Sequence, residues 1–173
     1  WSLKFITINP IIQNNFSARG GSESVSYYLA TGYTSQEGIL YGEDKSFFDR
    51  FNFTTNVDVD LTDKLTARVY NTYSNEKGSG LGDVLFNALN MSPTTPVYDA
   101  NGNFGISNTI TQEVKNPLAQ ISNSYNESNV NKITGKVELE YDVFKDFSIT
   151  GRLGYNYVDI KDKSFSPLVY YGA

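Results

Sequence analysis

The feature that most limits the fold of this chain is a strict alternation of apolar and polar side chains along five long runs. Between residues 51 and 61, phenylalanine, valine and leucine fill most odd positions, whereas asparagine, threonine and aspartate fill the even ones. Successive side chains of a β-strand point to opposite faces, so this period predicts strands with one apolar and one polar face. Each run is about twice as long as a usual strand of ~5–6 residues. The five runs are 25–34, 51–61, 65–74, 133–143 and 147–157.

Connections of two very different lengths separate these runs. Short turns join the runs in pairs, and residues 14–20 add a sixth strand before the first turn. Antiparallel neighbours can be joined by turns this short, so the sequence predicts an all-β fold of three hairpins. The short turns are 21–24, 62–64 and 144–146, and the long connections are 39–48 and 76–130.

Alternation alone is compatible with two architectures. In a soluble β-sandwich the apolar face is the core, whereas in a membrane barrel it meets lipid and the polar face lines the lumen. Three features favour the barrel: run lengths near the ~9–11 residues that cross a bilayer, short and long connections at opposite strand ends, and aromatic residues near both ends of the runs. A sheet in lipid has to close, and single-chain barrels begin at about eight strands, so we expect these six strands to be part of a larger wall.

Composition excludes several classes of function. The 173 residues contain neither Cys nor His, which removes disulfides, thiolate catalysis, the commonest zinc ligand and the commonest general base. With 14 basic and 19 acidic side chains, a net charge of −5 and no basic cluster, the chain is not expected to bind nucleic acid. Acids two residues apart, such as Asp58 and Asp60, are ~7 Å apart on a strand, which would suit glycoside hydrolysis. A solvated lumen explains these acids equally well, and we predict no enzyme, no cofactor and no metal site.

Several short motifs, in order along residues 10–157, give the chain a family likeness. Together they resemble the SusC/RagA family of TonB-dependent outer-membrane transporters, which is known from Bacteroidetes. The motifs are Gln13–Glu23, Tyr27–Tyr33, Gln36–Ile39, Arg50–Phe53, Asn56–Asp58, Asn87–Pro93, Pro96–Asp99, Asn101–Asn103 and Asn116–Ala119.

The resemblance implies a role in the bacterial outer membrane. Residues 1–173 would be part of the β-barrel domain of an importer for glycans or peptides, without its plug domain and TonB box. The implied partners are a SusD-like surface lipoprotein, TonB acting through the missing N-terminal part, the outer-membrane lipid, and the glycan or peptide substrate. Two alternatives stay open: a soluble β-sandwich module that binds carbohydrate or protein, as an adhesin does, and a passive porin-like barrel.

The two later hairpins predict acid–base pairs on the polar face. Three-residue turns would place Leu61 opposite Leu65 and Val143 opposite Phe147. We expect the resulting charge pairs to line the lumen near the plug, although ordinary cross-strand pairing would also explain them. The predicted pairs are Asp58 with Arg68 and Glu138 with Arg152.

The long connection 76–130 is the expected functional region, because loops of this length are uncommon unless they have a role. Residues 83–91 suit a short helix with Val84, Leu85, Ala88 and Leu89 on its apolar side. Asn101-Gly102 predicts a tight hairpin tip, which explains the partly calcium-loop-like residues 99–103 better than a metal site does. Candidate contacts to substrate or to a lid protein are Phe86, Asn90, Tyr98, Asp99, Asn101 and Phe104, with Tyr41, Phe47 and Phe48 in the shorter loop. The alternative is that these side chains fold the loops on themselves.

Overall fold

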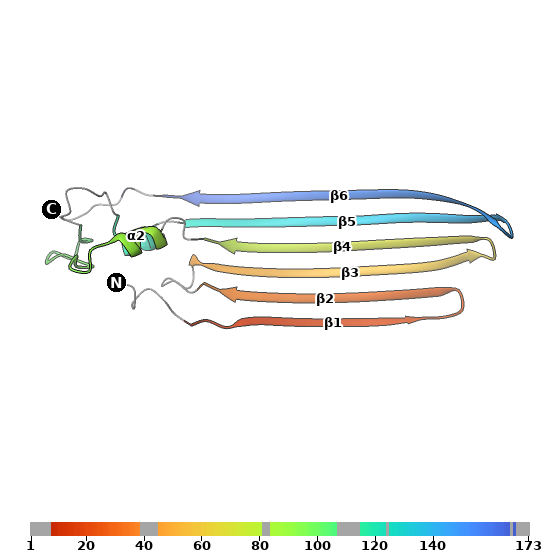
Figure 1. Cartoon of the computed structure of the whole chain (residues 1–173), viewed down its shortest axis with the longest axis horizontal. Helices are drawn as coiled ribbons and strands as arrows, with labels where there is room; N and C mark the ends of the chain where they lie inside the picture. Colours follow the sequence, from red (N-terminus) through yellow and green to blue (C-terminus); the bar gives the residue numbers. More distant parts are fainter. Residues whose placement is uncertain are drawn as a thin grey trace.

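Six long strands form one antiparallel sheet in which every strand pairs with its neighbours in sequence (Figure 1). The computed structural model describes residues 8–38, 45–80, 84–106, 115–123, 125–166 and 168. The predicted all-β fold of three hairpins is confirmed. The strands are β1 (Ile11–Gly21), β2 (Val25–Glu37), β3 (Phe47–Thr62), β4 (Leu65–Ser79), β5 (Tyr125–Phe144) and β6 (Phe147–Phe165).

The strands extend further toward the long connections than the alternation indicated. β5 has 20 residues and β6 has 19, because the hydrogen-bonded ladder continues through residues 125–132 and 158–165. Phe47 and Phe48 therefore lie in β3 and not in a loop, which corrects the prediction for them. Tyr41 lies outside the described residues.

The strand register agrees with the prediction, but the turns are tighter. Asp58 lies opposite Arg68, and Glu138 lies opposite Arg152. The pairing of Leu61 with Leu65 is wrong by one residue, because Thr62 pairs with Leu65 across a two-residue turn. Phe144 likewise pairs with Phe147, and the ladder shifts register just before each of these turns. The extra residue of each irregularity restores the predicted register along the rest of the hairpin.

One face of the sheet carries an apolar band that nothing covers within the described ranges. Ile149 and Leu153 of β6 are 57% and 70% exposed. From Phe147 to Tyr157, about ten residues at ~3.3 Å each, tilted by ~40°, give a height of about 25 Å, the height of a lipid-facing barrel band. A row of aromatic and β-branched residues crosses the sheet at the upper limit of the band: Thr31, Phe53, Tyr73, Ile133 and Tyr157. Four residues further up, the corresponding row is polar: Ser35, Asp49, Lys77, Asn129 and Lys161.

A small lobe lies beyond the sheet, at the end away from the tight turns (Figure 1). It contains the helices α2 (Val84–Asn90) and α3 (Pro117–Asn123), neither of which is long and apolar enough to cross a bilayer. Its apolar core consists of Val84, Ala88 and Ile121, with Leu118 packed against it.

The buried stripe of α2 differs from the predicted one. Val84 and Ala88 are buried as expected, but Leu85 and Leu89 are 51% and 71% exposed. Asn87 is buried instead and donates from Nδ2 to Oε1 of Gln120 in α3 at 2.7 Å. The helix contacts α3 along one narrow stripe, so only positions three and four apart are covered.

Candidate functional site

A charged cluster occupies the polar face of β4, β5 and β6. Its centre is Glu138, whose side chain is 8% exposed. The carboxylate accepts from Arg68 Nη1 at 3.0 Å, from Lys136 Nζ at 3.3 Å and from Arg152 Nε at 2.7 Å. Arg68 also pairs with Glu140. One acid on β5 therefore joins three cations from three neighbouring strands.

The strand register explains why these side chains meet. Arg68, Glu138 and Arg152 occupy one row across the sheet, and Lys136 lies two residues along β5 on the same face. The predicted Glu138–Arg152 contact is present, but the guanidinium of Arg68 bonds to β5 and not to Asp58. This corrects the expected Asp58–Arg68 ion pair. The guanidinium of Arg68 lies between one carboxylate on β3 and two on β5. The β5 side therefore offers it more acceptor oxygen atoms.

A hollow of about 430 Å³ lies beside the cluster, over β1 to β4. Oδ1 of Asp58 is buried there and has no hydrogen-bond partner among the described residues. The ammonium of Lys136 lies 4.7 Å from the ring centroid of Tyr70 and links the hollow to the cluster. The residues that line the hollow are Arg19, Gly20, Ser26, Tyr27, Tyr28, Asn56, Asp58 and Tyr70.

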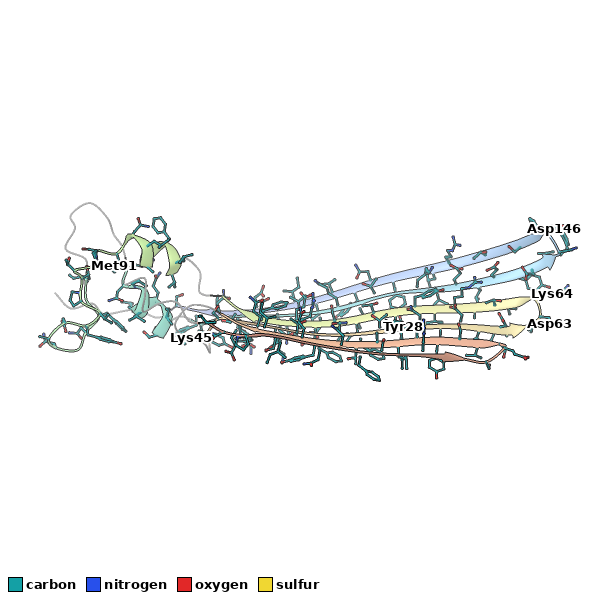
Figure 2. The ribbon with its side chains drawn as sticks, turned by 60° about the horizontal axis from the view of Figure 1, so that its bottom comes forward. Tyr28, Lys45, Asp63, Lys64, Met91 and Asp146 are labelled. Atoms are coloured by element: carbon teal, nitrogen blue, oxygen red, sulfur yellow. The ribbon has the colours of Figure 1, made fainter. Side chains whose placement is uncertain are left out.

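The second set of candidate residues lies in the lobe, at the other end of the sheet. Figure 2 shows Met91 of the lobe and the turn residues Asp63, Lys64 and Asp146 at opposite ends of the molecule. The charged cluster and the lobe residues therefore do not form one site. The described residues also contain no group of three or more acidic side chains placed to hold a metal ion.

The predicted hairpin tip is present in the lobe. Tyr98 pairs with Phe104, and their ring centroids are 5.2 Å apart. Asp99 closes the tip: its Oδ1 accepts from the backbone N–H groups of Asn101 and Asn103, both at 2.8 Å. Gly102 has a φ of 82°, a conformation that favours glycine. Asp99 and Asn101 thus serve the turn, while Tyr98 remains 54% exposed.

The closure of this tip predicts a pH dependence. The N–H groups of Asn103 above all, and those of Asn101 and Gly102, hold the pKa of Asp99 below its ordinary value. The carboxylate therefore stabilises the tip at any pH above its ordinary pKa, and this support is lost as the pH falls through the lowered pKa. We expect the protection of the amides in residues 97–105, measured relative to their intrinsic exchange rates at each pH, to be unaffected by mild acidification and to fall only below the usual aspartate range. An Asp99→Asn variant that matched the wild type at neutral pH would contradict this account.

Asn90 and Phe86 lie on the exposed part of α2. Nδ2 of Asn90 donates to the carbonyl of Phe86 at 2.8 Å, and the Phe86 side chain is 65% exposed. With Leu85 and Leu89, Phe86 forms an uncovered apolar patch, which we call the α2 patch. Exposed apolar side chains that gather in this way mark interaction surfaces more often than isolated ones do.

Asn116 organises the lobe, and no role was predicted for it. It is 1% exposed, and its Nδ2 donates to the carbonyls of Val97 and Gly105, both at 3.0 Å. Its Oδ1 accepts from the N–H groups of Leu118 at 3.1 Å and Ala119 at 3.4 Å, which caps α3. The sequence signal was available, because an asparagine directly before a proline is a frequent start of a helix.

The chain resembles known proteins over nearly its whole length, although no family model matches it. Two TonB-dependent receptors of Formosa agariphila are 29% identical over 160 residues and 24% identical over 178 residues. These alignments cover 91% and 96% of this chain but 16% and 17% of the relatives. The chain thus spans about a sixth of the length of the curated relatives it matches.

Solved structures show the same fold. The RagAB peptide importer in its open-open state superposes with a TM-score of 0.76 at 18% identity, over 100% of this chain and 20% of that one. A second structure of the RagAB peptide transporter gives 0.73 at 18% identity, over 95% and 19%. The predicted barrel segment, the family likeness and the outer-membrane location are confirmed, and the relatives are receptors and transporters rather than enzymes. In barrels of this fold an apolar band of this height faces lipid and the polar face lines the lumen.

Proposed function

We propose that this segment of a SusC/RagA-like TonB-dependent receptor is part of the wall of an outer-membrane importer, with residues 1–173 belonging to its β-barrel domain. The observation that carries the proposal is a single six-stranded sheet with one banded apolar face and one polar face. Its outer strands, β1 and β6, each pair with one neighbour in the sheet. Because lipid offers no hydrogen-bond partners, both edges need further strands, which the rest of a longer parent chain would supply.

The polar face would contact whatever fills the lumen. Wide transporter barrels are plugged, and the charged cluster around Glu138 with the neighbouring hollow offers both signs of charge to such a plug. In this mechanism TonB acts on the plug, and the wall segment provides a fixed surface. The stiffness of that surface comes from the continuous β4–β5–β6 ladder beneath the cluster.

The lobe would face the cell exterior, where a SusD-like surface lipoprotein closes over the barrel. The α2 patch supports this contact, because Leu85, Phe86 and Leu89 are large, apolar and more than half exposed on a helix that its own core already fixes. Tyr98 supports a separate contact with a glycan or a peptide. It stands on a rigid hairpin tip, and an exposed aromatic ring packs against apolar faces of either substrate class.

The test is co-purification of the full-length protein with its SusD-like lipoprotein from outer membranes. Phe86→Ser is expected to weaken the complex by about tenfold or more, since a central apolar anchor often contributes that much. Phe144→Ser is the matched control, because Phe144 is 67% exposed, like Phe86, but lies at the tight turn between β5 and β6, at the end of the sheet away from the lobe.

Two outcomes would contradict the proposal. If no SusD-like lipoprotein accompanies the wild-type protein, the importer with a lid is wrong. If the complex forms but both phenylalanine variants bind equally well, the importer stands and the α2 patch is not the lid contact.

A further inference from the structure

A polar side chain, Asn71, lies within the apolar band on the lipid-facing side of the sheet. It sits on β4 opposite Thr55 of β3 and Gly135 of β5. The row below it on the same face is aliphatic from β3 to β6: Val57, Val69, Val137 and Leu153. The row above it carries Phe53, Tyr73, Ile133 and Tyr157. An amide at this depth has no water to bond with, so leaving it unsatisfied is costly.

Tyr155 of β6 supplies a donor for the oxygen atom of this amide. Its hydroxyl donates to Oδ1 of Asn71, two strands away. Tyr155 lies opposite Gly135, and Gly135 lies opposite Asn71, so the ring crosses β5 directly over the glycine. The bond therefore connects β4 with β6 and passes over the strand between them.

Only a glycine leaves room for this crossing. A Cβ at position 135 would overlap both the Tyr155 ring and the Asn71 amide. Gly151 lies on the same face of β6, and a Cβ there would meet nothing within 4 Å. The absence of a side chain at 135 thus has a specific geometric reason that does not apply at 151.

Other asparagines on this face do not need such a device. Asn75 donates to Asn129 and Asn131, both at 2.8 Å, and Tyr73 donates to Asn131 at 3.0 Å. These residues lie at or above the aromatic row, where water and lipid head groups can complete their hydrogen bonds. Asn71 lies below that row.

We propose that Asn71, Gly135 and Tyr155 form a clasp on the lipid side of the barrel, which provides a hydrogen-bond donor for the amide oxygen of Asn71 at membrane depth and ties β4, β5 and β6 together. The proposal requires the barrel fold but not the importer function. Glycines covered by aromatic rings are a known device for fixing strand register. Here the ring also delivers a hydroxyl to a polar group that lipid would otherwise contact.

The experiment measures hydrogen exchange of the β5 and β6 amides in the full-length protein reconstituted in lipid. Gly135→Ala is expected to accelerate local exchange by about fivefold or more, because it displaces Tyr155 and leaves a polar group unpaired. The control Gly151→Ala is expected to change exchange little. In a Tyr155→Ala background, Gly135→Ala should have a clearly smaller effect than in the wild type, since only the contact with the Asn71 amide remains to be displaced.

A second pair of variants keeps the test decisive if Gly135→Ala fails to fold. Tyr155→Phe removes only the hydroxyl and should accelerate exchange, whereas the same substitution at Tyr157 should not. In an Asn71→Val background, Tyr155→Phe should be neutral, because no amide remains to be satisfied. Equal effects of Tyr155→Phe with and without Asn71 would overturn the clasp, as would equal effects of alanine at 135 and 151.

Discussion

Replacement of Asn116 by alanine is expected to unfold the lobe while the sheet stays intact. The substitution removes two donors and two acceptor contacts at a side chain that is 1% exposed. Loss of a helix N-cap costs about 1 kcal/mol, and the buried carbonyl of Gly105, which loses the Asn116 donor, costs about 1–3 kcal/mol. The carbonyl of Val97 still accepts from the backbone N–H of Gly105 at 3.0 Å. The sum is about 2–4 kcal/mol. The apolar core of the lobe, with four small or medium side chains, has little to offset it.

The measurement is limited proteolysis and hydrogen exchange of residues 84–123 in the full-length protein. Asn90→Ala is the matched control, because Asn90 is an exposed asparagine of the same lobe with one hydrogen bond, to Phe86. Asn116→Asp separates the two roles of the side chain. It keeps the oxygen atom that caps α3, but it replaces the Nδ2 donor by a second oxygen atom, which faces the carbonyls of Val97 and Gly105. It should therefore destabilise the lobe nearly as much as alanine, and a stable Asn116→Asp lobe would mean that the cap alone holds it.

The alternation predicted the sheet well where one face meets lipid and poorly where it does not. From 133 to 143 and from 147 to 157 the two faces have different surroundings, so residue type reports the strand directly. Beyond them the pattern reverses, because Val158 and Ile160 fall on the face that is polar from 147 to 157, and charged residues occupy the other face at positions 159–163. The backbone ladder continues although the side chains no longer keep the period of the band, which is why the predicted strands ended early.

Side-chain partners were less predictable than register. Counting from the turns placed Arg68 opposite Asp58 correctly, but which carboxylate the guanidinium selects depends on the next strand. That strand, β5, is separated from β4 by the lobe, and its register cannot be counted from a short turn. The exposure of Leu85 and Leu89 was missed for a related reason. A helical period identifies an apolar side, but the width of the buried stripe depends on how much of the partner helix reaches it.

Replacement of Glu138 by glutamine is expected to destabilise the β4–β6 part of the wall more than any other single charge change on this face. The carboxylate is the common acceptor for Arg68, Lys136 and Arg152, and its side chain is 8% exposed. Without it, three cations on adjacent strands repel one another, and only Arg68 retains an acid, Glu140. Glu140→Gln is the control, because it removes one acid from a guanidinium that still contacts Glu138.

The comparison is made by urea unfolding of the full-length protein in lipid vesicles at low and at high salt. At low salt, Glu138→Gln should lower the unfolding midpoint clearly and Glu140→Gln only slightly. High salt should reduce the difference between the two unfolding midpoints, because the Arg152 and Lys136 side chains are 66% and 46% exposed and their repulsion is screened.

If high salt leaves this difference unchanged, the loss of stability in Glu138→Gln comes from lost hydrogen bonds rather than from charge repulsion. Equal midpoints for the two variants would mean that the cations of this row are balanced by something other than Glu138. The acids on the far side of the lumen, or on whatever fills it, would then be the groups to test.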